Sequence, residues 1–184
     1  MKRLTDILLS LCALLLLAPV LLLAALAIML DSGTPVLFRQ TRVGLGGREF
    51  GMFKFRSMVP DAAARGPYFT QDGDPRVTRV GRFLRRSSID ELPQLFNVLA
   101  GDMSLVGPRP DLPAQRALYA SADWDQRCSV RPGITGLAQA LVRSEGTPEQ
   151  RLALDLRYTH AVSLRLDFKV MWWTLKRLHG KGSN

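Results

Sequence analysis

Two adjacent carboxylates, Asp90 and Glu91, stand in a strongly cationic stretch of the chain. Arg85 lies shortly before them, and Arg109 follows between two prolines. Carboxylates among several guanidinium groups indicate chemistry on a phosphorylated substrate. A more ordinary interpretation is also open. Ser88 with Glu91 fits the Ser-x-x-Glu pattern of a helix capping box, and acids are common in a first helical turn.

The position of Pro93 limits where a helix around these acids can begin. If Ser88 were the N-cap, Pro93 would fall past the first turn, where its ring clashes with the preceding carbonyl. A helix that begins nearer Asp90 keeps Pro93 in the tolerated first turn, and Gly101 then suits its C-terminal end. The sequence therefore predicts that Asp90 and Glu91 lie at a helix N-terminus, where free N–H groups attract phosphate.

Residues 35–58 predict a β-hairpin, because two apolar and basic strands flank a glycine-rich turn. Lys54 and Arg56 are two residues apart on the return strand, so we expect them to share one face. A headgroup or phosphate role is plausible for this face, although a half-buried strand is the ordinary interpretation. Arg109 has a backbone stiffened by Pro108 and Pro110, which suits a guanidinium that binds phosphate in a bidentate manner.

The composition restricts the class of partner. The chain has 184 residues, a formal net charge of +9 and a sequence pI of about 10.4. Such an excess of positive charge suits nucleic acid, an anionic membrane surface or a phosphorylated substrate. Because no helix-turn-helix, RNP-like or zinc-ligand pattern is present, we expect no nucleic-acid partner. The two cysteines, Cys12 and Cys128, imply no disulfide framework.

Residues 7–30 are almost entirely apolar, and the length suits a helix that crosses a bilayer. Pro19 divides this run into two arms of about a dozen residues, each roughly 16–18 Å long and about one leaflet deep. Basic residues flank both ends, so the positive-inside rule is satisfied only if both ends face the cytoplasm. The sequence favours a kinked, re-entrant hairpin over residues 1–33, with a straight transmembrane helix as the open alternative.

The remainder of the chain, residues 34–184, predicts one small α+β catalytic domain that contains the β-hairpin and several amphipathic helices. A polar, turn-rich loop over residues 59–79 precedes short helices at 80–86 and from Asp90 to about Leu99. Further helices are predicted at residues 148–160 and 166–178. The last helix has an apolar stripe that includes Phe168 and Trp172, with cations alongside. This stripe suits either core packing or a helix that lies at a membrane interface.

Four segments together resemble the bacterial sugar transferases, the monotopic polyprenyl-phosphate phosphoglycosyl transferases. They are Lys-Phe-Arg-Ser-Met at 54–58, Ser-Ile-Asp-Glu-Leu-Pro-Gln-Leu-Phe-Asn-Val at 88–98, Gly-Asp-Met-Ser-Leu-Val-Gly-Pro-Arg-Pro at 101–110, and Arg-Pro-Gly-Ile-Thr-Gly at 131–136. The resemblance covers nearly the whole chain in the same order. It is closest to the minimal form of the family, a catalytic domain with one N-terminal membrane element.

The resemblance implies a reaction at the cytoplasmic face of the bacterial inner membrane. A UDP-sugar donates its phosphosugar to polyprenyl (undecaprenyl) phosphate and releases UMP, as the first membrane step of a glycan pathway. By the same resemblance, Asp90 is the nucleophile that forms a covalent aspartyl-phosphosugar intermediate. Glu91 is its partner in binding Mg²⁺ or handling protons. Ala18-Pro19 matches the family's break in a re-entrant anchor.

The resemblance also suggests which residues bind substrate and which partners the protein has. Arg85, Arg109 and Arg143 become candidates to clamp phosphates, and Asp155 to touch Mg²⁺ or nucleotide, although it could equally pair with nearby arginines. Implied partners are a nucleotide sugar, polyprenyl phosphate and membrane lipid, with downstream glycosyltransferases as further candidates. The sequence after Gln139 departs from the family's Asn-Gly-Arg-Asn-like pattern, which leaves the sugar and nucleotide preference open. A non-enzymatic, membrane-anchored basic adaptor is the alternative function.

Overall fold

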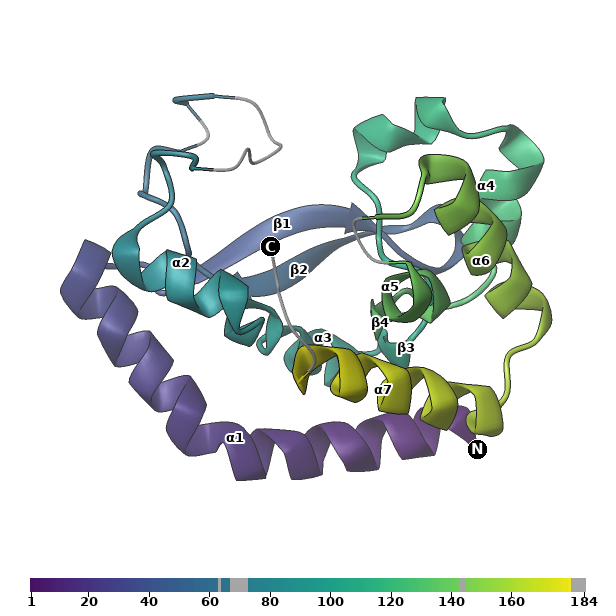
Figure 1. Cartoon of the computed structure of the whole chain (residues 1–184), viewed down its shortest axis with the longest axis horizontal. Helices are drawn as coiled ribbons and strands as arrows, with labels where there is room; N and C mark the ends of the chain where they lie inside the picture. Colours follow the sequence, from purple (N-terminus) through teal and green to yellow (C-terminus); the bar gives the residue numbers. More distant parts are fainter. Residues whose placement is uncertain (63, 67–72, 143–144, 180–184) are drawn as a thin grey trace.

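The computed structural model describes residues 1–62, 64–66, 73–142 and 145–179 of the chain. Helices and strands are mixed, as the sequence predicts (Figure 1). The α-helices are α1 (Lys2–Ser32), α2 (Arg79–Arg86), α3 (Gln94–Ala100), α4 (Ser121–Arg127), α5 (Leu137–Leu141), α6 (Pro148–His160) and α7 (Leu164–His179). The strands are β1 (Leu37–Val43), β2 (Glu49–Phe55), β3 (Ser104–Val106) and β4 (Gly133–Thr135), and the 3₁₀ turns are η1 (Leu45–Gly47), η2 (Ile89–Glu91) and η3 (Pro113–Leu118).

The N-terminal helix α1 is one continuous helix of 31 residues with Pro19 inside it. It bends near its middle (Figure 1), as expected where proline removes a backbone hydrogen bond and its ring presses on the preceding turn. The predicted break at Ala18 and Pro19 is therefore a bend within an uninterrupted helix. Among the described residues, α1 is the one helix long and apolar enough to cross a membrane. Its re-entrant placement in a bilayer stays a prediction.

The amino-terminal end of α1 is bound to the rest of the domain by polar contacts. Lys2 Nζ donates to Asp167 Oδ2 on α7 (2.6 Å), and Arg3 donates to backbone carbonyls at the end of α3. The buried carboxylate of Asp6 accepts from Ser104 Oγ on β3 (2.9 Å). Charged side chains are seldom buried without partners, so these contacts fix the position of this end.

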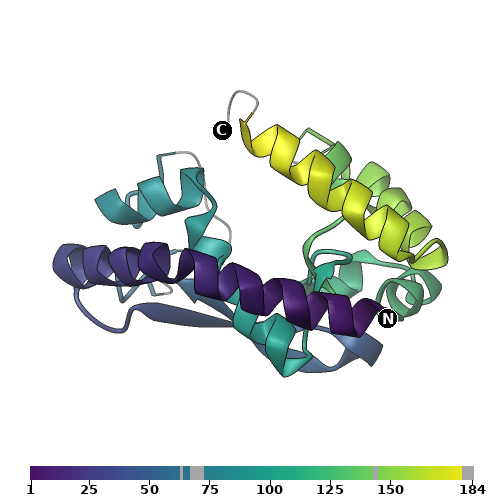
Figure 2. The same ribbon diagram turned by 90° about the horizontal axis from the view of Figure 1, so that it is seen from below.

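The carboxyl-terminal end of α1 is bound to the same domain at a different place. Arg56 Nη2, just after β2, donates to the carbonyls of Ser32 (2.8 Å) and Gly33 (2.6 Å). Ala24 and Ile28 are buried against β2 and α2. Figure 2 shows α1 extending from α7 at its amino-terminal end to α2 at its other end. The middle of the helix is exposed.

Two small sheets connect the helices. β1 and β2 form the predicted antiparallel hairpin, with Phe38 opposite Lys54 and Arg42 opposite Phe50. β3 and β4 form a short parallel pair that the sequence analysis did not predict. Val106 of β3 belongs to a core cluster that includes Tyr158 of α6 and Val170 of α7. This core supports the segment after β3, which carries Arg109.

The predicted apolar stripe of α7 is divided between two environments. Val170 is buried and Met171 packs against the core cluster. Phe168, Trp172 and Leu175 are exposed, with more than half of each residue accessible to solvent. Core packing therefore accounts for only part of the stripe. The remaining part is an exposed apolar face on the described residues of α7.

Candidate active site

The two carboxylates are held by the 3₁₀ turn η2 between α2 and α3. Ser88 adopts a left-handed conformation (φ 57°) and its side chain makes no capping hydrogen bond, so the capping box is not formed. Pro93 is the N-cap of α3, which begins at Gln94. The prediction that this helix begins near Asp90 is therefore wrong. Because proline has no N–H to donate, it marks the helix start, and the acids lie in the turn before it.

Glu91 is the centre of an ion-pair group that we call the Glu91 cluster: Glu91, Lys54, Arg109 and the neighbouring Asp90. Lys54 Nζ donates to Glu91 Oε1 (3.0 Å) and Arg109 Nη2 donates to the same oxygen (2.5 Å). Burial favours the neutral acid, but Arg109 and Lys54 outweigh it and hold the pKa of Glu91 well below its usual range. Glu91 is thus ionised at neutral pH.

Asp90 differs from its neighbour because its carboxylate lacks a cationic partner. It is 8% exposed, and within the described part of the chain its side chain makes no hydrogen bond or ion pair. Burial, and then the charge of Glu91, raise the pKa of Asp90 to about 6, although Lys54, Arg85 and Arg109 oppose this. A buried carboxylate with its oxygens uncommitted is suited to attack a phosphorus atom that enters this charged setting.

Two further arginines surround the cluster. Arg85, on α2, donates through Nε to Ser57 Oγ (2.8 Å), and its charge acts on Asp90. Arg42, on β1, donates through Nη1 to the carbonyl of Pro110, next to Arg109 (3.0 Å). Burial, and then repulsion from Arg109, lower the pKa of Arg42 to about 10. The neighbouring guanidinium groups of Arg42 and Arg109 form a favourable place for an anion.

Arg42 is absent from the residues that the sequence analysis selected for the site. Opposite residues of a hairpin share a face, as do residues two apart. The pairing of Phe38 with Lys54 therefore places Phe38, Gln40 and Arg42 on the face of Lys54. That signal was present in the sequence, but using it requires the register of the hairpin.

Two predicted binding residues make no contact with the carboxylate pair in the described structure, and a third falls outside the described residues. Arg56 lies at the carboxyl-terminal end of α1, where its Nε and Nη1 are buried without hydrogen-bond partners. Asp155, on α6, accepts from Arg127 Nε (2.9 Å), which corresponds to the pairing role that the sequence left open. Arg143 lies outside the described residues.

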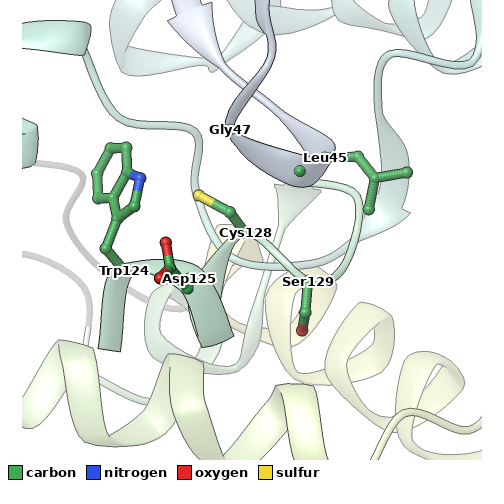
Figure 3. A pocket seen from close by; sticks show the side chains of 7 residues that line it. Leu45, Gly47, Trp124, Asp125, Cys128 and Ser129 are labelled. Carbon is green, nitrogen blue, oxygen red and sulfur yellow. The ribbon is translucent and has the colours of Figure 1, made fainter. Parts of the chain in front are cut away.

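A separate hollow lies at the turn of the hairpin beside α4 (Figure 3). Its volume is about 260 Å³, and its walls include Leu45, Trp124, Asp125, Cys128 and Ser129. The Trp124 ring and the Cys128 sulfur both face this space (Figure 3). No residue of the Glu91 cluster and no arginine lines the hollow. It therefore lacks the cations that a phosphate would require.

The residues present are compatible with Mg²⁺. Among the described residues, no group of three or more His, Cys, Asp or Glu side chains gathers in one place. Mg²⁺ does not require such a cage, because it is commonly held by one or two carboxylates together with substrate phosphates and water. Asp90, with its oxygens uncommitted, and the adjacent Glu91 are the residues that fit this mode of binding.

Comparison with known proteins places the chain in a family. The family model for the bacterial sugar transferases matches residues 1–181. An undecaprenyl-phosphate glucose phosphotransferase of Komagataeibacter xylinus is 51% identical over 96% of this chain and 35% of its own length. A UDP-glucose:undecaprenyl-phosphate glucose-1-phosphate transferase of Caulobacter vibrioides is 48% identical over 96% of this chain and 69% of its own length. An exopolysaccharide production protein of Rhizobium leguminosarum is 45% identical over 99% of this chain and 98% of its own length.

The chain spans about a third of the Komagataeibacter relative and nearly all of the Rhizobium one. The match extends from the apolar helix α1 through η2 with its carboxylate pair to α7. The chain belongs to the bacterial sugar transferase family.

Proposed function

We propose that the protein transfers a sugar phosphate from a UDP-sugar to polyprenyl phosphate and releases UMP. The observation that carries this proposal is the buried, uncommitted carboxylate of Asp90 beside a Glu91 that Lys54 and Arg109 keep ionised. The names of the relatives support it, since they specify undecaprenyl phosphate and, in several cases, UDP-glucose. A non-enzymatic adaptor is not favoured, because these relatives are named as transferases.

The proposed reaction has two displacements at one phosphorus atom. In the first, an Asp90 oxygen attacks the phosphorus that bears the sugar, and the bond from that phosphorus to the bridging oxygen breaks. UMP leaves with the electron pair, and the sugar phosphate remains esterified to Asp90. In the second, a phosphate oxygen of polyprenyl phosphate attacks the same phosphorus. The bond to Asp90 breaks, the carboxylate is restored, and the product is a polyprenyl-diphosphate sugar.

The cations around the carboxylates have distinct tasks in this scheme. Lys54 and Arg109 neutralise Glu91 and thereby limit the repulsion between its charge and an incoming diphosphate. Arg85 and Arg42 flank the cluster and can contact phosphate oxygens. Mg²⁺ is the proposed cofactor, held by Asp90 and Glu91. When bound, it would offset the negative charge on the diphosphate as the bond breaks.

The arrangement of α1 supports a re-entrant anchor. A straight helix of this length would extend about 46 Å, so a bilayer span would put its two ends on opposite faces. Here Lys2 and Asp6 at one end, and Ser32 at the other, bind one domain. The exposed leucines lie in the middle of the helix, Leu15, Leu16, Leu22 and Leu23 among them. We propose that this middle part dips into one leaflet of the inner membrane while the domain stays at its cytoplasmic face.

The exposed apolar face of α7 supports the same placement. Phe168, Trp172 and Leu175 are exposed beside Lys169 and Lys176. An aromatic face flanked by cations suits the boundary between headgroups and acyl chains. In this placement the carboxylate pair would work close to the depth of a lipid phosphate.

The test of the activity is a panel of UDP-sugars incubated with undecaprenyl phosphate, Mg²⁺ and the full chain in nanodiscs, with UMP release as the measurement. We expect release with at least one donor and a dependence on the lipid acceptor. Intact-mass spectrometry with donor alone should detect protein enlarged by one sugar phosphate. An unmodified protein under conditions where the lipid product still accumulates would exclude the covalent intermediate.

The test of the anchor uses single cysteines at exposed positions near its two ends. In a background with both native cysteines replaced, Cys12→Ser and Cys128→Ser, the variants Leu4→Cys and Thr34→Cys are treated with a membrane-impermeant maleimide on sealed vesicles of known orientation. We expect both positions to react from the cytoplasmic side only. Reaction of the two positions from opposite sides would establish a span instead.

A further inference from the structure

The backbone that carries Arg109 is bound at three successive carbonyls. Arg127 Nη2 donates to the carbonyl of Arg109 itself (2.7 Å). The next two carbonyls receive hydrogen bonds from β1, one from the Arg42 side chain (3.0 Å) and one from the Val43 backbone N–H (2.9 Å). A loop with every one of these acceptors satisfied by a different donor has little freedom to move.

Arg127 is the buried member of this arrangement, and its side chain is 8% exposed. Besides the Arg109 carbonyl, it donates through Nε to Asp155 Oδ2 on α6 (2.9 Å) and through Nη1 to Asp111 Oδ2. We call Arg127, Asp111 and Asp155 the Arg127 cluster. The planar guanidinium of Arg127 therefore joins α4, α6 and the loop of Arg109. These contacts use the fixed fork geometry of arginine, which lysine lacks.

The Arg127 cluster is not a device for stability alone. It contains two carboxylates for one guanidinium, and Asp155 Oδ1 is buried and has no hydrogen-bond partner among the described residues. Burial raises the pKa of Asp155, although Arg127 opposes this. Buried ionic groups with unequal charge commonly cost as much free energy as they return. What the cluster does accomplish is to fix the orientation of Arg127 toward the Arg109 carbonyl.

The guanidinium end of the Arg109 side chain shows why a fixed backbone matters. Its side chain is 44% exposed, and its guanidinium donates to both carboxylate oxygens of Glu91. A long, half-exposed side chain retains many rotamers unless its backbone is fixed. A displacement of about 1 Å at a charged catalytic group can reduce the rate by about 100-fold.

We propose that Arg127, oriented by Asp155 and Asp111, is a positioning residue that holds Arg109 against Glu91 during sugar-phosphate transfer. The inference rests on the proposed function of the Glu91 cluster. It assigns Asp155 to this support and not to contact with nucleotide or metal.

The first experiment compares Arg127→Lys and Asp155→Asn with Thr159→Val in the full chain in nanodiscs. Thr159 is the matched control, because its hydroxyl on α6 accepts from Gln126 Nε2 on α4 (2.9 Å) and so joins the same two helices as the Asp155–Arg127 pair, without contacting the Arg109 loop. We expect kcat to fall about 10- to 100-fold in Arg127→Lys and Asp155→Asn, with the donor KM changed less. Thr159→Val should lower Tm and leave kcat within about 2-fold. Wild-type kcat in folded Arg127→Lys or Asp155→Asn would overturn the proposal.

The second experiment is a double-mutant cycle between Arg127→Lys and Arg109→Lys, read on turnover and on the dissociation constant of UMP. If Arg127 acts through Arg109, the double variant should resemble Arg109→Lys in both measurements. Independent effects that multiply would overturn the proposal. If wild type and Thr159→Val both fail to release UMP from any donor, it is the proposed function that fails, which separates the two outcomes.

Discussion

The molecule has two neighbouring clusters of carboxylates and cations that differ in how completely they are satisfied. In the Arg127 cluster, each of the three guanidinium nitrogens of Arg127 donates a hydrogen bond, and both carboxylates are paired with Arg127, although Asp155 Oδ1 makes no hydrogen bond within the described residues. In the Glu91 cluster, Glu91 is paired twice, Asp90 is unpaired, and Arg109 is 44% exposed. The comparison teaches that burial and charge do not identify a reactive site on their own. The cluster with an acid that no cation pairs, Asp90, is the one suited to chemistry.

The two clusters meet at Arg109, because Arg127 binds its backbone carbonyl and its side chain belongs to the Glu91 cluster. In Arg109, the backbone is thus held by the supporting cluster, and the side chain acts in the proposed reactive one. Substitutions of the acids should therefore fall into two classes, with large effects on turnover in the Glu91 cluster and smaller ones in the Arg127 cluster.

The largest effect is expected from Asp90→Asn. Removal of a covalent nucleophile commonly reduces turnover by more than about 1,000-fold, and we expect a loss of this size in UMP release. The matching change in the other cluster, Asp155→Asn, should cost far less. Equal losses in the two variants would remove the distinction between the clusters, and full activity of Asp90→Asn would exclude Asp90 as the nucleophile.

Glu91→Gln should have the second largest effect, about 100-fold on kcat. The substitution leaves Lys54 and Arg109 without their carboxylate, so both cations are free to reorient. Steady-state UMP release gives the measurement. Glu149→Gln, at an exposed position in the first turn of α6, is the control and should resemble wild type. A Glu91→Gln variant as active as this control would show that Glu91 is dispensable.

The pH dependence of stability gives a third prediction. Because burial raises the pKa of Asp90 to about 6 in the folded protein, its ionisation destabilises the fold as pH rises from about 4 through 6. Asp90→Asn has no such ionisation, so without substrate or metal it should exceed wild type in stability by up to about 3 kcal/mol above pH 7. The difference should vanish near pH 4.

Denaturant unfolding at a series of pH values measures this difference. For Glu91 the sign is opposite, because its lowered pKa adds stability above its unfolded pKa that is lost as pH falls. An Asp90→Asn variant that is less stable than wild type at pH 8 would mean that Asp90 is not a buried, unpaired acid. Such a result would remove the contrast between the two acids.

Much of the site could be predicted from the sequence because its signals are local. The Asp-Glu pair, the prolines around Arg109 and the glycine turn of the hairpin each act within a few residues. The ends of α6 were predicted correctly for the same reason, since Thr147 and Gln150 form a local capping box. Pro93 was the exception, because the sequence allowed it either inside the first turn or just before it.

The unpredicted features depend on residues far apart in the chain. The parallel pairing of β3 with β4 joins two strands of three residues each, too short for any periodicity to identify. The two ends of α1 are bound by residues near positions 56, 104 and 167, which no local pattern relates to the anchor. The Arg127 cluster likewise unites three separate segments. Arg42 lies between the local and the long-range cases, because the register of the hairpin alone would have placed it on the face of Lys54.

The smallest expected effect tests that placement of Arg42. Arg42→Met should raise the donor KM about 10-fold with a smaller change in kcat, because a charge-assisted contact to phosphate stabilises the bound donor and the transition state alike. Arg39→Met is the matched control, since Arg39 lies on the same strand but on the opposite face, against the Phe53 ring. If Arg42 only supports the Pro110 carbonyl, kcat should fall instead and KM should stay near wild type, and Arg42 would then belong with the supporting residues.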